Sequence, residues 1–469
     1  MEAATGSCHV VAMPYPGRGH INPMLVLSRL LASRGIQVTC VVTEEWLDLL
    51  GSSSPPPLPL PSEVRLVTIP NIIPSENGRA ADFPGFLDAV STKMGAPFEP
   101  LLDRLEPPAS AIIADSYLPW AVEVGNQRGI PVLSFCTMAA GFFSVLYHFH
   151  RLPLPVDRRV SIEATIEEDE YLEQYIPGIT SIKLSDILPV LSAPTLQRAL
   201  EAFSWVKKAQ CILFTSFYEI EASVIDALRA ELPCPVYTVG PSIPYMMLKE
   251  ENPVRSIPSN AHHLDYFSWL DSQPNNSVLY ISLGSFLSVS QSQLDEIAMG
   301  LCASETRFLW VARGESSRMR EMVGDMGLVV PWCDQLRTLC HPSVGGFLTH
   351  CGWNLTLEAV FAGVPMLTFP IFWDQPPDSR LIVDEWKVGI SLKEKTGEDN
   401  IVRREEIAEV VRRLMDLDGT ESKELRRRAL ELREASLRTM EEGGSSYANL
   451  TSFVKSLVNS HGWKNVVQV

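Results

Sequence analysis

A histidine and an aspartate, far apart in the sequence, stand where a general base could be assembled. His20 lies in the segment Pro16–Pro23, which follows a β-branched run and opens a helical pattern. Asp115 ends another such run, Ala111–Asp115. A carboxylate bound to one imidazole nitrogen fixes the tautomer and stabilises the imidazolium that forms after proton transfer. Each residue alone also has an ordinary interpretation, since a histidine at a helix start is usually structural and Asp115 could cap the next helix.

A second group of polar and aromatic residues lies between positions 332 and 375. There a β-branched run ends at His350, glycine turns the chain, and a helical pattern starts near Asn354. Such a helix start offers free N–H groups and the positive end of a dipole to a phosphate. The block also holds side chains that could stack on a base or accept from ribose and sugar hydroxyls: Trp332, Glu358, Asp374 and Gln375.

Short β-branched runs alternate with helical patterns along most of the chain, which predicts parallel sheets covered by helices on both faces. The first series is His9–Tyr15, Ile36–Thr43, Val64–Ile69, Ala111–Asp115, Pro131–Phe135, Cys211–Thr215 and Val236–Val239. The second is Ser277–Leu283, Arg307–Ala312, Leu328–Pro331, Val344–Thr349 and Val364–Pro370. We therefore expect an α/β protein of two doubly wound domains, with ligands beyond the carboxyl ends of the strands.

The domain boundaries follow from a proline-rich interruption of this alternation. We expect a first domain over residues 1–240, a linker over 241–260 and a second domain over 261–444. Residues 445–469 contain an amphipathic helical pattern that we expect to pack back on the first domain.

Composition restricts the compartment and the partners. The net charge of −17 argues against binding to nucleic acid or to an anionic membrane. Met1–His9 lacks the features of a secretory signal, and the most apolar window, Pro131–Tyr147, is short for a bilayer span. Nine cysteines without a CxxC pair fit reduced thiols. We expect a cytoplasmic monomer with no nucleic-acid partner and no stable membrane insertion.

Taken together, these motifs resemble the plant UDP-dependent glycosyltransferases. The stretch from Trp332 to Gln375 matches the signature of that family, Gly19–Pro23 its catalytic motif, and Tyr280–Ser285 its phosphate-contacting strand and turn. The resemblance spans nearly the whole chain. It implies the GT-B fold, in which two Rossmann-like domains face each other across a cleft. It also implies a UDP-sugar as co-substrate, a hydrophobic small molecule as acceptor, and neither a cofactor nor a metal.

The resemblance assigns His20 and Asp115 to catalysis and a larger set to the donor. Trp332 would stack on uracil, with Gln335 and Glu358 near the ribose. The phosphates would meet Ser285, His350 and Asn354, and the sugar would meet Trp353, Asp374 and Gln375, with Thr137 approaching from the first domain. The expected donor site also includes Cys333, Gly352 and Leu355. Gln375 is similar to the residue of members that prefer glucose.

Three residues depart from the family pattern. Leu355 replaces a serine that usually contacts phosphate, Arg18 replaces a neutral residue, and Asp378 replaces a frequent asparagine that we expect to tolerate the change. For the acceptor, aromatic residues of the first domain suggest an apolar cavity, although each could equally belong to the core: Tyr117, Trp120, Phe142 and Phe143.

The reaction implied is an inverting transfer that forms a β-glycoside, with the leaving diphosphate stabilised by hydrogen-bond donors. The Asp416–Asp418 triplet lies in a charged helical region, which does not suit a metal site beside the donor. Asn22 occupies the place of the third glycine of a dinucleotide fingerprint, which disfavours a nicotinamide site. A sugar-nucleotide epimerase and a non-catalytic sugar-nucleotide binder are the alternative functions.

Overall fold

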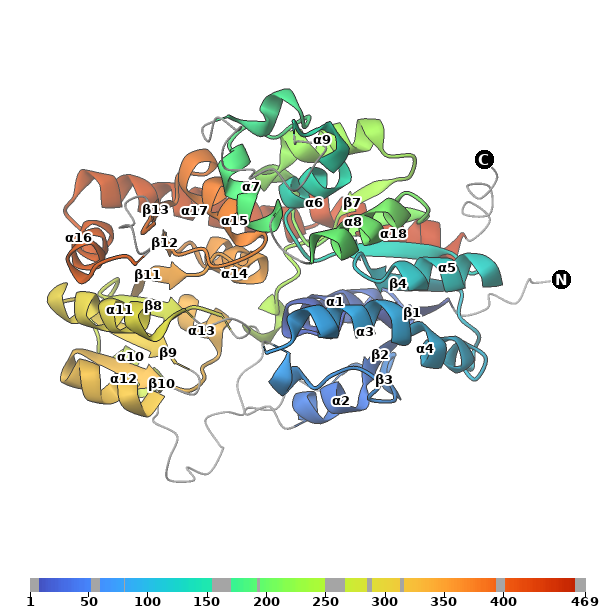
Figure 1. Cartoon of the computed structure of the whole chain (residues 1–469), viewed down its shortest axis with the longest axis horizontal. Helices are drawn as coiled ribbons and strands as arrows, with labels where there is room; N and C mark the ends of the chain where they lie inside the picture. Colours follow the sequence, from blue (N-terminus) through green and yellow to red (C-terminus); the bar gives the residue numbers. More distant parts are fainter. Residues whose placement is uncertain are drawn as a thin grey trace.

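The computed structural model describes residues 8–51, 60–79, 81–153, 170–191, 195–248, 266–284, 289–312, 316–393 and 401–459. Two parallel sheets, each flanked by helices, form two halves of the molecule (Figure 1). We call residues 8–248 together with the last helix the N-terminal half, and residues 266–440 the C-terminal half. The predicted α/β class with two doubly wound sheets is confirmed.

The sheet of the N-terminal half has seven parallel strands in the order β3-β2-β1-β4-β5-β6-β7. Their bounds are β1 His9–Met13, β2 Gln37–Thr43, β3 Val64–Ile69, β4 Ala111–Asp115, β5 Val132–Cys136, β6 Cys211–Phe214 and β7 Val236–Thr238. Most of their side chains are buried, as expected for strands covered on both faces. The chain order reverses between β1 and β4, which pair in register, so a crevice forms beyond their carboxyl ends.

The helices of this half connect consecutive strands. They are α1 Arg18–Ala32, α2 Glu44–Gly51, α3 Phe83–Lys93, α4 Gly95–Leu102, α5 Pro119–Arg128, α6 Ala140–Tyr147, α7 Leu184–Leu191, α8 Leu196–Val206 and α9 Ala222–Glu231. The segment between β3 and β4 contains two consecutive helices, α3 and α4, separated by the single residue Met94. The break has a local cause, because Pro97 cannot donate a hydrogen bond to the Lys93 carbonyl and its ring crowds that oxygen.

The sheet of the C-terminal half has six parallel strands in the order β10-β9-β8-β11-β12-β13. Their bounds are β8 Val278–Ser282, β9 Arg307–Val311, β10 Gly327–Val330, β11 Val344–Thr349, β12 Met366–Thr368 and β13 Gly389–Ser391, the last of which the sequence pattern missed. The helices are α10 Tyr266–Asp271, α11 Gln291–Ala303, α12 Ser316–Val323, α13 Gln335–Leu339, α14 Trp353–Ala362, α15 Gln375–Arg380, α16 Arg404–Met415 and α17 Thr420–Met440. Here the order reverses between β8 and β11.

The last helix, α18 Ser445–Val458, returns to the first sheet and lies beside β7 (Figure 1). Its apolar face is buried there, and Asn449 Nδ2 donates to the Thr238 carbonyl at 3.1 Å. Other contacts join the two halves directly, including Arg380 Nε to the Asp186 carboxylate at 2.9 Å and Trp386 Nε1 to the Ile220 carbonyl at 3.1 Å. Across the described ranges, every helix is too short or too polar to cross a membrane.

Candidate active site

A cavity of about 610 Å³ is lined by residues of both halves, beyond the carboxyl ends of the strands. The N-terminal half contributes the turn between β1 and α1 and the segment after β4. The C-terminal half contributes Gly284 after β8 and His350 after β11. The crevices at the two reversals of strand order therefore belong to the same cavity.

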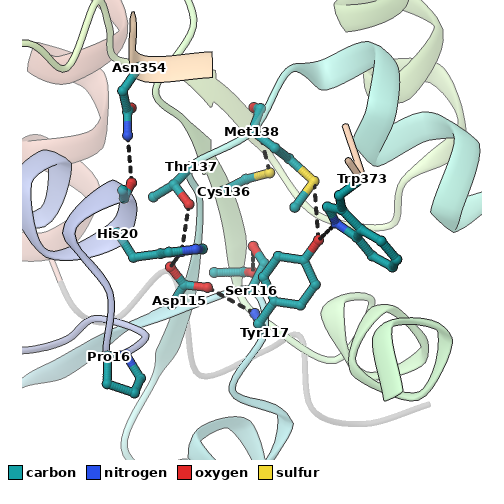
Figure 2. Close-up of polar contacts among 12 residues, drawn as sticks. Pro16, His20, Asp115, Ser116, Tyr117, Cys136, Thr137, Met138, Asn354 and Trp373 are labelled. Atoms are coloured by element: carbon teal, nitrogen blue, oxygen red, sulfur yellow. Dashed lines mark hydrogen bonds and ion pairs between the residues drawn. The ribbon is translucent and has the colours of Figure 1, made fainter. Parts of the chain in front are cut away.

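His20 and Asp115 meet at the N-terminal side of this cavity. Because β1 and β4 are neighbours, His20 in the first turn of α1 reaches the last residue of β4, and its Nδ1–H donates to Asp115 Oδ2 at 2.8 Å (Figure 2). The Asp115 side chain is 1% exposed and that of His20 is 25% exposed. Asp115 Oδ1 accepts from Tyr117 N at 3.0 Å and does not cap α5. With Nδ1 engaged, Nε2 is the nitrogen left for a substrate.

Thr137, which follows β5, is a third member of this group. Its Oγ1 lies 2.8 Å from the same Nδ1 of His20 (Figure 2). The hydroxyl therefore helps to hold the imidazole ring. A contact between Thr137 and the sugar stays a prediction.

On the opposite wall, His350 lies between two glycines that leave room for its ring. A Cβ added at Gly284 or Gly352 would approach His350 Nε2 to 2.8 Å, and Gly284 has φ +88°. Burial lowers the pKa of His350 to about 4, so the ring is neutral at pH 7 and keeps one N–H donor. Cys351, with φ +68°, completes the turn into α14. Ser285 lies outside the described residues.

A chain of hydrogen bonds organises the part of the wall predicted for the nucleoside. Tyr280 Oη donates to Gln335 Oε1 at 3.2 Å, and Gln335 Nε2 donates to Glu358 Oε2 at 2.5 Å. Burial raises the pKa of Glu358 to about 7. Trp332 and Cys333 line the cavity beside them, and Cys333 Sγ lies 3.3 Å from Tyr280 Oη. Gln335 thus orients Glu358.

The residues predicted for the sugar come from the start of α14 and the loop before α15. Gln375 Oε1 accepts from the backbone N–H groups of Ile371 and Phe372 at 2.8 and 2.9 Å, so only its NH₂ group faces a ligand. Burial raises the pKa of Asp374 to about 6. Trp353 is buried, and its Nε1 has no hydrogen-bond partner within the described ranges. These groups can present donors and acceptors to sugar hydroxyls.

Asn354 and Leu355 lie in the first turn of α14, and both line the cavity. Asn354 Nδ2 donates to the Gly19 carbonyl at 2.6 Å, across the cleft and next to His20 (Figure 2). Its Oδ1 is buried without a partner in the described part of the chain. The Asn354 amide, which is predicted to contact a phosphate, thus also forms a hydrogen bond between the two halves.

Of the four aromatic residues predicted for the acceptor, only Tyr117 lines the cavity. Trp120 lies in the core, where its Nε1 donates to the Val90 carbonyl at 3.1 Å. Phe142 and Phe143 are fully buried and belong to a hydrophobic core that extends through both halves. The expectation that these three face the acceptor is therefore corrected, because neighbouring helices cover them.

Other residues of the N-terminal half line the cavity and were not predicted. They include Tyr15, Arg79, Phe83, Leu87, Met138, Arg198 and Ala199. Tyr15 could have been found, since it precedes the turn that carries His20, whereas nothing in the sequence marks the residues of α3 and α8. Arg18 also lines the cavity, with its guanidinium carbon 5.8 Å from the centre of the Trp46 ring.

The sequence matches two family profiles. Residues 237–407 match the UDP-glucoronosyl and UDP-glucosyl transferase family, and residues 6–47 match the glycosyltransferase N-terminal domain. The chain is 46% identical over 460 residues to UDP-glycosyltransferase 87A2 of Arabidopsis thaliana, covering 97% of each protein. It is 33% identical over 482 residues to a 7-deoxyloganetin glucosyltransferase of Gardenia jasminoides, covering 96% and 98%.

Solved structures show the same architecture. Os79 from O. sativa, in complex with U2F and trichothecene, matches with a TM-score of 0.80 at 29% identity, covering 96% of this chain and 100% of that one. The UGT2 of Phytolacca americana, complexed with UDP-2fluoro-glucose and pterostilbene, matches with a TM-score of 0.78 at 28% identity, with the same coverage. The predicted resemblance and GT-B fold are thus confirmed, and the chain belongs to the plant UDP-glycosyltransferase family of enzymes, which transfer sugars from UDP-sugars to small molecules.

Proposed function

We propose that this enzyme transfers glucose from UDP-glucose to a hydroxyl group of a hydrophobic small molecule, with inversion at the anomeric carbon. The observation that carries the proposal is the His20–Asp115 hydrogen bond of 2.8 Å, which leaves Nε2 for the acceptor. Nε2 takes the proton of the acceptor hydroxyl, whose oxygen then forms a bond to the anomeric carbon. The bond from that carbon to the UDP oxygen breaks, and an α-linked donor gives a β-glycoside.

The same proposal assigns a different substrate to each half of the molecule. Residues 1–240 would hold the acceptor and residues 261–444 the donor, joined by the linker 241–260, of which 249–260 lie outside the described residues. Glucose is supported by Gln375 and by the glucosyltransferase of Gardenia jasminoides, and an apolar acceptor by the pterostilbene complex of the Phytolacca americana enzyme.

The test is to incubate the protein with UDP-glucose or UDP-galactose and a panel of phenols and alcohols. The large coupling between the anomeric and neighbouring protons in the NMR spectrum of a product would identify a β-glucoside and support the proposal. An epimerised nucleotide without acceptor product would instead support an epimerase. Binding of UDP-glucose with no product from any acceptor would indicate a non-catalytic binder.

Catalysis is expected to proceed without a divalent ion. The backbone N–H groups at the start of α14 can donate hydrogen bonds to the diphosphate as it gains charge. Asp416 and Asp418 lie between α16 and α17 and are not among the residues of the cavity wall. Treatment with EDTA should leave most of the initial rate. Complete loss of activity, restored by Mg²⁺ or Mn²⁺, would contradict this expectation.

Replacing Leu355 by serine is expected to tighten UDP-glucose binding several-fold. Leu355 lines the cavity but cannot donate to a phosphate oxygen, and a hydrogen bond to a charged group contributes roughly 1.5–3 kcal/mol. We expect the backbone N–H groups of α14 to supply part of that stabilisation already. Calorimetry with UDP-glucose and UDP measures the change, and uridine, which has no phosphate, is the control. Unchanged or weaker binding of UDP would show that this side chain does not reach the diphosphate.

A further inference from the structure

Tyr117 joins the base on one side of the cavity to the opposite half of the molecule. Its backbone N–H donates to Asp115 Oδ1 at 3.0 Å, while the other oxygen of that carboxylate binds His20. Its side chain crosses the cleft, where Tyr117 Oη accepts from Trp373 Nε1 at 2.9 Å (Figure 2). Tyr117 therefore contacts both the general base and the loop that precedes Asp374.

Trp373 is a residue whose conformation needs support. Its φ of +62° lies in the left-handed region, which bulky side chains rarely adopt and which persists when surrounding contacts impose it. Its ring packs edge-on against Phe142, with centroids 5.7 Å apart, and stacks on Phe372 at 5.8 Å. The hydrogen bond that the indole N–H donates to Tyr117 Oη fixes the ring from the other half. The buried Phe142, predicted to contact the acceptor, instead supports this indole.

The loop held in this way carries or binds two of the three residues predicted to hold the sugar, Asp374 and Gln375, whereas the third, Trp353, lies at the start of α14. Asp374 follows Trp373 directly, and Gln375 is bound to the backbone of the same loop. The wall predicted for the nucleoside and phosphates is built on other segments, the start of α13 and the region from β11 into α14. A displacement of Trp373 would therefore move the sugar contacts and leave the nucleotide contacts in place.

The Tyr117 hydroxyl is suited to a lasting structural contact. Burial raises its pKa well above the ordinary value, so the phenol stays neutral at pH 7, accepts from the indole and directs its own hydrogen toward Met138 Sδ at 3.9 Å. Without this oxygen, the Trp373 N–H would lose its partner in a partly buried position, and an unpaired buried donor is costly.

We propose that Tyr117 is a positioning residue, which sets the sugar-holding loop relative to His20 through its hydrogen bond with Trp373. The proposal rests on the function proposed above. Transfer requires the acceptor oxygen and the anomeric carbon to be held within about 3–3.5 Å of each other. One half holds the base and the other holds the sugar, and Tyr117 connects them.

The test is Tyr117→Phe, which removes the oxygen and keeps the ring. We expect kcat to fall by roughly tenfold, the scale of one lost buried hydrogen bond, while the Kd of UDP stays unchanged. The difference in affinity between UDP-glucose and UDP should shrink, because the sugar contacts are no longer held in place. Trp373→Phe should have a similar effect, and the double variant should be no worse than the more impaired single variant.

Tyr218→Phe is the matched control, because it removes a hydroxyl that donates to Asp226 Oδ2 at 2.8 Å but does not line the cavity. It should change none of these quantities. If Tyr117→Phe changes only the KM of the acceptor, Tyr117 is merely an acceptor contact and the proposal fails. Additive effects of the two cavity variants would also overturn it. A wild-type protein without any transferase activity would defeat the proposed function instead, and the comparison of UDP-glucose with UDP would still test Tyr117.

Discussion

Replacing His20 by alanine is expected to lower turnover by roughly a hundredfold or more, the usual scale for the loss of a general base. Asp115 holds Nδ1 of His20 at 2.8 Å, which leaves Nε2 for the acceptor, and the variant lacks the imidazole that takes the acceptor proton. Steady-state rates with saturating UDP-glucose and a simple alcohol acceptor measure the loss. UDP affinity should hardly change, since the nucleotide is predicted to bind the opposite wall.

Asp115→Asn should also impair turnover with UDP affinity intact. An asparagine amide can donate to Nδ1, which leaves the proton on Nε2 and blocks its function as a base. His150→Ala is the control, because His150 is exposed on a short helix away from the cavity. Near wild-type turnover of His20→Ala on an alcohol acceptor would show that His20 is not the base.

Replacing Asp378 by asparagine is expected to stabilise the protein at neutral and alkaline pH. Asp378 is fully buried in α15, and neither carboxylate oxygen has a hydrogen-bond partner within the described ranges. Burial raises its pKa well above the ordinary value of 3.8, and the nearby Asp374 and Glu221 carboxylates add to the shift. Folding therefore favours the protonated, neutral form of this side chain, whereas asparagine is neutral at every pH and needs no proton.

The sign of the pH dependence follows from that shift. Because the folded protein binds the proton more tightly than the unfolded chain, its stability falls as pH rises above about 4. The melting temperature of Asp378→Asn should exceed that of the wild type at pH 8 by about 2–12 °C, from roughly 1–3 kcal/mol for the buried group and about 2–4 °C per kcal/mol. The difference should vanish near pH 4.

Thermal unfolding between pH 4 and pH 8 measures this effect. Asp384→Asn is the control, because its carboxylate is 41% exposed and forms only a surface pair with Arg380. The melting temperature of this variant should show no gain over the wild type that increases with pH. A lower melting temperature of Asp378→Asn at pH 8 would mean that the carboxyl group is not held neutral in the folded protein.

The sequence determined the fold class and the location of the site, because both depend on local patterns. Most buried strands of a parallel sheet appear as short β-branched runs, and their ends are marked by the residues that follow. Asp115 and His350 lie at or just after the ends of β4 and β11, and His20 lies in the first turn of the helix that follows β1. Since parallel strands share one carboxyl edge, residues at those ends must gather there. Gly352 was also recognisable from the sequence, because it turns the chain between the β-branched run that ends at His350 and the helical pattern that follows.

The tertiary structure alone decided which other side chains face the cavity. Whether an aromatic residue lines the site depends on which helix covers it, so Trp120 and Phe143 are in the core while Phe83, from a helix with no such signal, lines the cavity. The hydrogen bond between Tyr117 and Trp373 joins residues 256 positions apart in the chain. No periodicity encodes such a pair, because its geometry arises only from the packing of the two halves against each other.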